Sequence, residues 1–249
     1  KKFFNTIQFV FAANDSQGMK YGTIGTKAKY FLSWKEDKGT VFKFEEIKEQ
    51  LDREISQFCN KERFLDLIKN FIIFDGGVKK LCRPNQYFGV KASQKFIGKR
   101  QGGVIWHTQG SGKSLTMVWL AKWIKRTQKK KRIFLITDRK ELDEQIEEVF
   151  YNVGEIAYRA KSGADLIDKL NSHEESVVCS LIHKFSNKND DNEDYDTYLD
   201  EIRKNLPKNF SPKGDIYLFV DECHRTQAGK LHKALTELLP NSIKIGFTG

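Results

Sequence analysis

Alternating apolar and polar positions mark the beginning of the chain. Between residues 3 and 34, apolar residues recur at every second position in FFNTIQFVFAAN, YGTIGT and YFLSW, and Gly18, Gly22 and Gly25 interrupt the runs. A period of two is typical of strands with one buried face, and glycines favour turns. The pattern predicts short antiparallel strands.

Helical spacing replaces this alternation between Phe42 and Phe74. Apolar residues now recur three or four positions apart, at Phe44, Ile47, Leu51, Ile55 and Phe58 and then at Phe64, Leu65, Ile68 and Phe71. This spacing predicts two amphipathic helices that bridge two domains. A further helix is expected from Pro84 through Lys99, because proline loses no hydrogen bond in a first helical turn.

After Gly102, short apolar runs alternate with amphipathic segments. The runs are 104–106, 133–137, 177–182, 216–220 and 243–247, and the amphipathic segments are 113–126, 140–150, 163–171, 194–206 and 227–239. Short, continuously apolar strands are typical of a parallel sheet that helices cover on both faces. The predicted fold class is therefore α/β.

Composition places this chain of 249 residues among globular proteins. With 39% hydrophobic residues and only 4 prolines, a disordered tail, a collagen-like repeat and a coiled coil are excluded. No run approaches the roughly 18 apolar residues of a membrane helix. Four widely spaced cysteines without a C-x-x-C pair indicate reduced thiols and a cytoplasmic protein.

Basic residues are concentrated in the first part of the chain. Residues 1–100 hold 20 Lys/Arg and 11 Asp/Glu, whereas residues 101–249 hold 23 and 22. The excess suggests a nucleic-acid partner, although a solvated surface explains it equally well. The basic run at 125–132 joins a helix to a buried strand, so we interpret it as a solvated turn.

The segment HTQGSGKS, residues 107–114, lies between a predicted strand and a predicted helix. Backbone N–H groups of such a loop bind phosphate oxygens, a lysine supplies positive charge, and a serine hydroxyl can bind Mg²⁺. The predicted phosphate-binding residues are Thr108, Gln109, Gly110, Ser111, Gly112, Lys113 and Ser114. His107 replaces the first glycine of the general pattern. A glycine-rich turn with an incidental lysine is the alternative, and the flanking strand and helix disfavour it.

A second motif, DECH, ends the apolar strand IYLFV. Carboxylates at the carboxyl edge of a parallel sheet face the ligand crevice. We expect Asp221 to hold Mg²⁺ and Glu222 to orient the attacking water. Alone, the pair could be surface acids. Zinc binding by Cys223 and His224 is disfavoured, because adjacent side chains on an extended strand point apart.

These motifs resemble a known family. HTQGSGKS, DECH and the final FTG resemble motifs I, II and the start of motif III of superfamily 2 helicases and translocases. The longer segments GGVIWHTQGSGKSLTMVWLA, IFLITDRKELDEQI and VDECHRTQAGKLHKAL resemble the motor (R) subunit of type I restriction enzymes. Upstream, FNTIQFVFAAN, KYGTIGTKAKYFLSW and NFIIFDGGVKKLCRPNQYFGVKA extend the resemblance over nearly the whole chain.

The resemblance implies an enzyme that uses ATP and Mg²⁺ to move double-stranded DNA and then cleaves it. It implies a nuclease-type α+β segment at residues 1–41, a helical linker at 42–83 and a parallel-sheet RecA-like P-loop motor domain at 84–249. Implied partners are the methyltransferase and specificity subunits, and the implied location is the bacterial or archaeal cytoplasm, on the nucleoid. Nuclease residues are expected before Lys1, and the second motor domain with its arginine finger after Gly249.

The resemblance also assigns roles to single residues. Gln86 matches the residue that recognises adenine, and Arg83 lies one turn before it. Arg139 matches a DNA-facing position in motif Ia, and His224 and Thr248 match positions that couple the nucleotide site to DNA. From spacing alone, Gln86 is more typical of a solvated helix residue, and His224 and Thr248 could equally be ordinary polar residues. Neighbouring Asp138 is as readily a helix N-cap.

The nuclease pattern Glu-x-Lys occurs at Glu36-Asp-Lys38 and Glu46-Ile-Lys48, and we interpret both matches as accidental. Two other functions stay open: another superfamily 2 DNA or RNA helicase or remodeller, and a non-enzymatic nucleic-acid-binding scaffold. The intact Lys113, Ser114, Asp221 and Glu222 argue against the scaffold.

Overall fold

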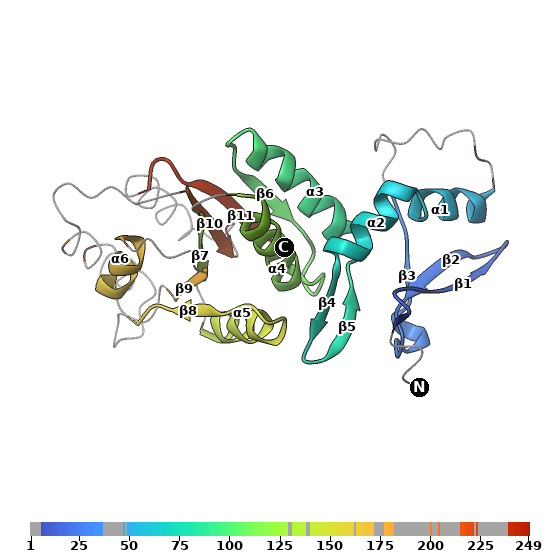
Figure 1. Ribbon diagram of the computed structural model, residues 1–249, viewed down its shortest axis with the longest axis horizontal. Helices are drawn as coiled ribbons and strands as arrows, with labels where there is room; N and C mark the ends of the chain where they lie inside the picture. The colour runs from blue at the N-terminus through green and yellow to red at the C-terminus, as the bar shows by residue number, and fades with distance from the viewer. Residues whose placement is uncertain are drawn as a thin grey trace. The chain divides into compact units, whose positions relative to one another are not determined.

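The computed structural model describes residues 6–36, 47, 49–128, 131–137, 140–161, 163–171, 177–181, 200, 204, 215–221, 223 and 239–249. The chain divides into two compact units, Lys1–Phe88 and Gly89–Gly249. Figure 1 shows the elements of both units in chain order.

The first unit begins with a three-stranded antiparallel sheet, as its alternating pattern predicts. The strands β1 (Val10–Asn14), β2 (Gly18–Gly22) and β3 (Leu32–Ser33) lie in the order β1-β2-β3. Tyr21 on β2 and Trp34 after β3 are buried together with Phe58. The Tyr21 and Phe58 rings lie 4.7 Å apart, and those of Trp34 and Phe58 lie 5.2 Å apart, so this sheet and the following helix share an aromatic core.

Two helices and a hairpin follow the sheet. The helices are α1 (Gln50–Phe58) and α2 (Lys61–Asn70), and Asn60 caps α2 by accepting a hydrogen bond from the backbone N–H of Arg63. The structure corrects the prediction that helical spacing continues to Phe74. Strands β4 (Ile72–Asp75) and β5 (Val78–Leu81) form an antiparallel hairpin instead. Gly76 and Gly77 have φ of 57° and 79°, which a tight hairpin turn requires, and β-branched residues favour strands.

Helix α3 (Pro84–Gly98) begins at Pro84, as predicted. Oε1 of Gln86 accepts a hydrogen bond from the backbone N–H of Arg83 at 2.7 Å. In a capping box, the side chain of the third helical residue accepts a hydrogen bond from the backbone N–H of the residue before the helix. Gln86 and Arg83 form this half of the motif. Gln86 therefore stabilises the start of its own helix.

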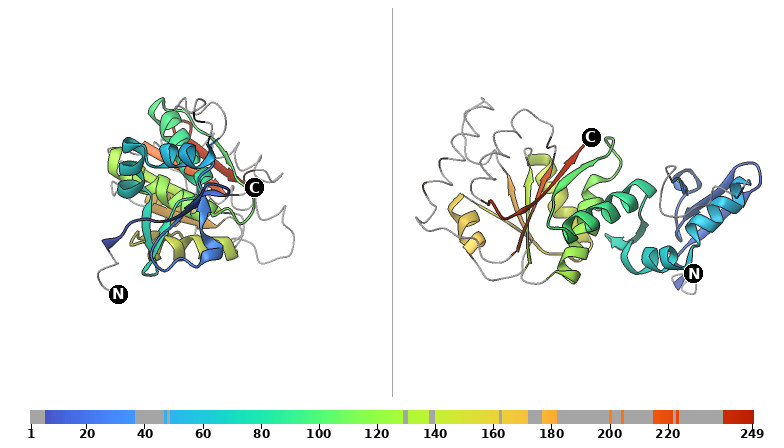
Figure 2. Two further views of the ribbon diagram at one scale, coloured as in Figure 1. Left: turned by 90° about the vertical axis from the view of Figure 1, so that its right-hand side faces the viewer. Right: turned by 90° about the horizontal axis from the view of Figure 1, so that it is seen from above.

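The second unit contains a six-stranded parallel sheet, which confirms the predicted α/β class. Its strands are β6 (Gly103–Trp106), β7 (Lys131–Thr137), β8 (Ala157–Arg159), β9 (Val177–Leu181), β10 (Asp215–Asp221) and β11 (Ile243–Thr248). Their order is β6-β11-β10-β7-β9-β8, and every pairing is parallel. Figure 2 shows the twist of this sheet from above.

Helices cover the sheet. Helix α4 (Lys113–Thr127) and α5 (Lys140–Asn152) contact each other and β7. Helix α6 (Gly163–Asn171) contributes Leu166, Ile167 and Leu170 to a core cluster with Phe134 and Ile136 of β7 and side chains of β9 and β10. Side chains alternate across each strand, so β7 is buried on both faces, as its continuous apolar run predicts.

Arg132 corrects the interpretation of residues 125–132 as a solvated turn. Lys131 and Arg132 open β7 and are buried, and Arg132 donates hydrogen bonds to the carbonyls of Lys169 and Leu170 at the end of α6. These carbonyls have no partner within their helix, so a guanidinium stabilises them. Among the described helices, none is long and apolar enough to span a bilayer.

Candidate nucleotide-binding site

The carboxyl ends of the sheet strands bring the predicted site residues to one edge. Asp221 ends β10 and pairs with Phe247 of β11, and the next residue of β11, Thr248, pairs with Trp106 at the end of β6. In open α/β sheets, ligands bind outside this edge. The motifs DECH and FTG and the loop after β6 therefore begin beside one another.

The loop after β6 is tied to β11 and folds back on itself. The backbone N–H of His107 donates to the carbonyl of Thr248 at 2.8 Å, and that of Ser111 donates to the carbonyl of Thr108 at 3.1 Å. Gly110 has φ of 74°. Left-handed backbone costs other residues free energy, so a glycine suits this turn.

Helix α4 begins directly at Lys113. Its N-cap is Gly112, with φ of 86°, and its first turn contains no acidic residue. Thr116 donates hydrogen bonds to the carbonyl of Gly112 from both its N–H and its hydroxyl, the latter at 3.2 Å. The first N–H groups of a helix and its dipole favour an anion, and Lys113 and Ser114 are half-buried at this end. The arrangement fits a phosphate.

Gly249 closes this site from the side of β11. A β-carbon placed on Gly249 would lie 2.8 Å from the carbonyl oxygen of His107, 3.2 Å from the backbone nitrogen of Gln109 and 3.0 Å from Nζ of Lys113. The FTG segment and the loop at 107–114 are thus in direct contact. The sequence motif includes Gly249, but its spacing does not reveal this contact.

Asp221 is held at the end of a buried strand with 8% of its surface exposed. Just beyond it, the N–H of Cys223 donates to the carbonyl of Phe247 at 3.2 Å. A β-carbon on Gly246 would come within 2.6 Å of Sγ of Cys223, so the thiol fills the space that this glycine leaves. Cys223 therefore packs against β11. Among the described residues, no three His, Cys, Asp or Glu side chains form a group that could hold a metal.

The loop and the sheet edge fit Mg²⁺ and a nucleotide. The hydroxyl of Ser114 and the carboxylate of Asp221 are oxygen ligands, the kind Mg²⁺ prefers in sites that it shares with phosphates. Thr108, Gln109 and Gly110 are exposed, and no heavy atom lies within 4 Å of a β-carbon on Gly110.

The other predicted residues differ in where they lie. Arg83 is exposed just before α3, and Gln86 is 2% exposed in its first turn. Thr248 is buried beside the loop. Four of the residues named above lie outside the part of the chain that the structure describes: Asp138, Arg139, Glu222 and His224. Most residues of the predicted helices at 194–206 and 227–239 also lie outside it.

Packing of α3 against the loop is a further feature, which the sequence did not predict. A β-carbon on Gly89 would lie 3.2 Å from Cε1 and Nε2 of His107. His107 occupies the position where the general phosphate-loop pattern has its first glycine. A glycine has no side chain there, whereas the His107 imidazole packs against Gly89 of α3. The histidine in place of the first glycine of the motif is the sequence signal that could have indicated this contact.

Type I restriction subunits match most or all of the chain. The chain is 30% identical, over an alignment of 274 positions including gaps, to the "Putative type I restriction enzyme MjaVIIIP endonuclease subunit" of Methanocaldococcus jannaschii, and the match covers 100% of the chain and 25% of the relative. The "Type I restriction enzyme HindI endonuclease subunit" of Haemophilus influenzae is 28% identical over 92% of the chain and 24% of its own length. These relatives confirm the resemblance to type I restriction subunits.

Solved structures confirm the motor-domain fold. The "Sulfolobus solfataricus SWI2/SNF2 ATPase core in complex with dsDNA" superposes with a TM-score of 0.51 at 18% identity, over 74% of this chain and 34% of the other. The "UvsW helicase from Bacteriophage T4" superposes with a TM-score of 0.50 at 18% identity, over 76% and 60%. The model of the family described as "SWI2/SNF2 ATPase" matches residues 85–249. With the phosphate loop, Asp221 and Thr248 at one edge of this sheet, the chain belongs to the SWI2/SNF2 ATPase family.

Proposed function

We propose that this chain is the nucleotide-hydrolysing part of the DNA-translocating subunit of a type I restriction enzyme. It spans about a quarter of the length of the two type I restriction relatives, so translocation and cleavage belong to the proposal. One observation supports it most. The loop at 107–114, Asp221 and Gly249 meet at one sheet edge, in a chain that resembles those subunits along its whole length.

Lys113 and the loop before it bind the phosphates in this proposal. The backbone N–H groups of the loop and the N-terminus of α4 surround the oxygens, and the Lys113 ammonium binds the β- and γ-phosphates. Gly110 and Gly112 allow the backbone to approach closely, and their positive φ values support this role.

Ser114 and Asp221 hold Mg²⁺ in this proposal. When bound, the metal neutralises charge that develops on the phosphates. Glu222, the residue after Asp221, orients the attacking water and accepts its proton.

Gln86 and Arg83 recognise the adenine in this proposal. A glutamine amide offers one donor and one acceptor, which match the N7 and N6 groups of adenine. Gln86 lies in the first turn of α3, where its Oε1 accepts from the N–H of Arg83. The match of Gln86 to the adenine-recognising position of the family supports the role.

The DNA contacts and partner subunits complete the proposal. Arg139 binds the DNA backbone, and His224 and Thr248 couple the nucleotide site to DNA. The hydrogen bond between Thr248 and His107 supports coupling, because it ties the end of β11 to the phosphate loop. Double-stranded DNA is the substrate that is moved, and methyltransferase and specificity subunits are the partners.

Two substitutions in the full-length protein test the hydrolytic site. We expect Lys113→Ala to abolish DNA-stimulated ATP hydrolysis, because it removes the charge that binds the phosphates. Glu222→Gln should reduce turnover by about a thousandfold or more but leave nucleotide binding nearly unchanged, because Glu222 acts on water. Steady-state ATPase assays and nucleotide titrations measure both effects.

Unchanged turnover in the Glu222→Gln protein would contradict the assigned roles. Cleavage assays separate the restriction subunit from another superfamily 2 helicase or remodeller. A restriction subunit should cleave DNA only when methyltransferase and specificity subunits are present.

A further inference from the structure

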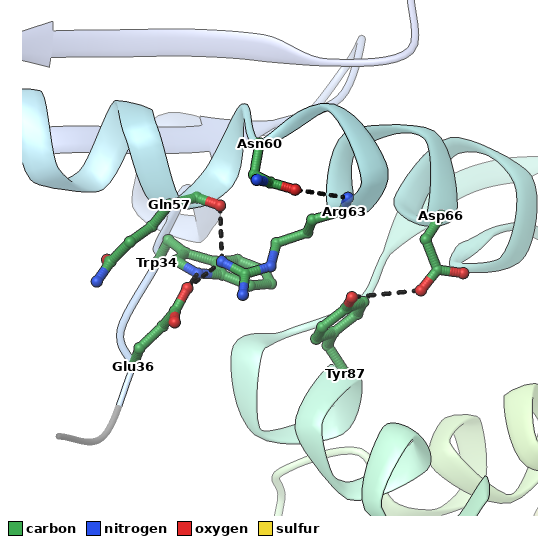
Figure 3. A network of polar contacts seen from close by, with 7 residues as sticks. All are labelled: Trp34, Glu36, Gln57, Asn60, Arg63, Asp66 and Tyr87. Atoms are coloured by element: carbon green, nitrogen blue, oxygen red, sulfur yellow. Dashed lines mark hydrogen bonds and ion pairs between the residues drawn. The ribbon is translucent and has the colours of Figure 1, made fainter. Parts of the chain in front are cut away.

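A buried arginine lies where the sheet and helices of the first unit meet. Figure 3 shows Arg63 of α2 beside Trp34, Glu36 and Gln57. Arg63 is 5% exposed. Its guanidinium carbon lies 5.3 Å from the ring centroid of Trp34, 5.7 Å from that of Phe88 and 5.8 Å from that of Tyr87. A cation surrounded by aromatic rings at such distances is stabilised by their quadrupoles, more strongly when it is desolvated.

The charge of Arg63 is neutralised inside the protein. Its Nη1 pairs with the carboxylate of Glu36, whose side chain is 2% exposed, and donates to the carbonyl of Gln57 at 2.6 Å. Nε1 of Trp34 donates to the same Glu36 oxygen at 2.7 Å. Glu36 follows β3, and Gln57 lies in α1, so one side chain joins the sheet, α1 and α2. Glu36 is also the glutamate of the Glu-x-Lys match at Glu36-Asp-Lys38, and its carboxylate is bound by Arg63 and Trp34.

Tyr87 adds a second polar contact at the start of α3. Its hydroxyl donates to Asp66 of α2 at 3.3 Å, and its ring lies 4.8 Å from that of Phe71. Burial, followed by the charge of Asp66, raises the pKa of Tyr87, so the hydroxyl remains a donor at neutral pH. On the side of β2, the hydroxyl of Tyr21 donates to the carbonyl of Cys82 at 2.9 Å. The start of α3 is therefore held by α2 and by β2.

These contacts involve the residues next to Gln86. Tyr87 and Phe88 follow Gln86 directly, and Gln86 itself is 2% exposed with its Oε1 on the N–H of Arg83. Rings that shift by a fraction of an ångström would rotate or tilt the first turn of α3. An apolar replacement of a buried ion pair often stabilises a protein equally well or better. The stability of the fold therefore does not by itself explain why an arginine lies beside the rings of Trp34, Tyr87 and Phe88.

We propose that Arg63 is a positioning residue for nucleobase recognition: it fixes Tyr87 and Phe88, and through them the amide of Gln86. This inference rests on the proposed function, because it takes the adenine as the group that Gln86 recognises. Arg63 does not contact the nucleotide. Its guanidinium sets the orientation of the first turn of α3, which carries Gln86. Substitutions of Arg63 should therefore change base selectivity more than turnover.

The experiment compares ATP and GTP as substrates of the full-length protein. Arg63→Met should raise KM for ATP by about tenfold, the order expected for one bidentate base contact, with KM for GTP and both kcat values within about twofold. Guanine has an oxygen where adenine has an amino group, so the Gln86 contact contributes little to GTP binding. The preference for ATP over GTP should therefore fall by about the same factor.

Arg63→Lys tests the positioning role of Arg63 if the Arg63→Met protein does not fold. Lysine keeps the charge beside Glu36 but lacks the planar group that packs on the rings. We expect it to raise KM for ATP by about threefold, and circular dichroism checks that the protein is folded.

Glu54→Gln is the matched control. Glu54 is buried in the same unit and accepts from the N–H of Met19 at 2.5 Å, but it joins β2 to α1 and not to α3. Its substitution should lower thermal stability without changing the ATP to GTP ratio. An unchanged ratio in folded Arg63 variants would overturn the proposal, as would a wild-type protein that does not discriminate between ATP and GTP. Retained hydrolysis in Lys113→Ala would instead overturn the proposed function.

Discussion

Close approach of backbones makes Gly249 a sensitive position of the nucleotide site. An added methyl group would press on the His107 carbonyl at 2.8 Å and on the Gln109 nitrogen at 3.2 Å, so the loop at 107–114 would have to move. We expect Gly249→Ala in the full-length protein to weaken ATP binding and hydrolysis by about tenfold, since small misplacements of catalytic groups are costly. Nucleotide titration and ATPase assays measure the change.

Gly103→Ala is the control for that substitution. Gly103 lies at the start of β6, no heavy atom lies within 4 Å of a β-carbon placed on it, and its φ is not positive. Its activity should match the wild type. If both alanine variants behave alike, contact between the FTG segment and the phosphate loop has no part in nucleotide binding.

Single residues of the site differ in how far the sequence predicts them. The placement of Lys113 and Ser114 at the start of α4 and of Asp221 at the end of β10 is predictable, because it depends on local spacing between a strand and a helix. The approach of Gly249 to Lys113 and the packing of Gly89 on His107 depend on which strands and helices become neighbours. Only the tertiary structure determines such contacts.

Arg132 offers a test at the scale of secondary-structure elements. Its guanidinium donates to Lys169 and Leu170 carbonyls at the end of α6, and burial lowers its pKa, although an arginine keeps its charge in proteins. Arg132→Met should lower the free energy of unfolding by about 2 kcal/mol, because the bonds to the helix end are lost. Urea denaturation followed by circular dichroism measures it.

The exposed Arg126 provides the comparison for that loss. Arg126 lies in the last turn of α4, in the same basic run, so its substitution by methionine should change the unfolding free energy by less than about 0.5 kcal/mol. Equal losses in the two variants would show that Arg132 contributes no more than a surface charge.

Elements differ in predictability for a physical reason. The apolar runs of β7 and β10 are buried on both faces, so their sequences predict buried strands directly. The hairpin β4-β5 follows a helix whose spacing continues through Phe74, and only the Gly76-Gly77 turn distinguishes it. Strand β8 has three residues, too few for any periodicity to be evident.

Across the chain, positive charge is concentrated in the first 100 residues, which include helix α3. Residues 1–100 hold 20 basic and 11 acidic residues, and the rest of the chain is nearly balanced. The proposed function requires movement along DNA of any sequence, for which contacts to phosphates suit better than contacts to base edges. Charge of this kind attracts duplex DNA by releasing counterions, whatever its sequence.

Binding of the full-length protein to duplex DNA, without partner subunits, should therefore depend steeply on salt and little on sequence. Each phosphate contact contributes about one unit to the slope of log K against log salt concentration, so Arg139→Ala should lower the slope by about one if Arg139 binds a phosphate. Titrations at several salt concentrations on two unrelated duplexes measure both quantities. A strong preference for one duplex would contradict phosphate-based binding, and an unchanged slope would remove Arg139 from the DNA contact.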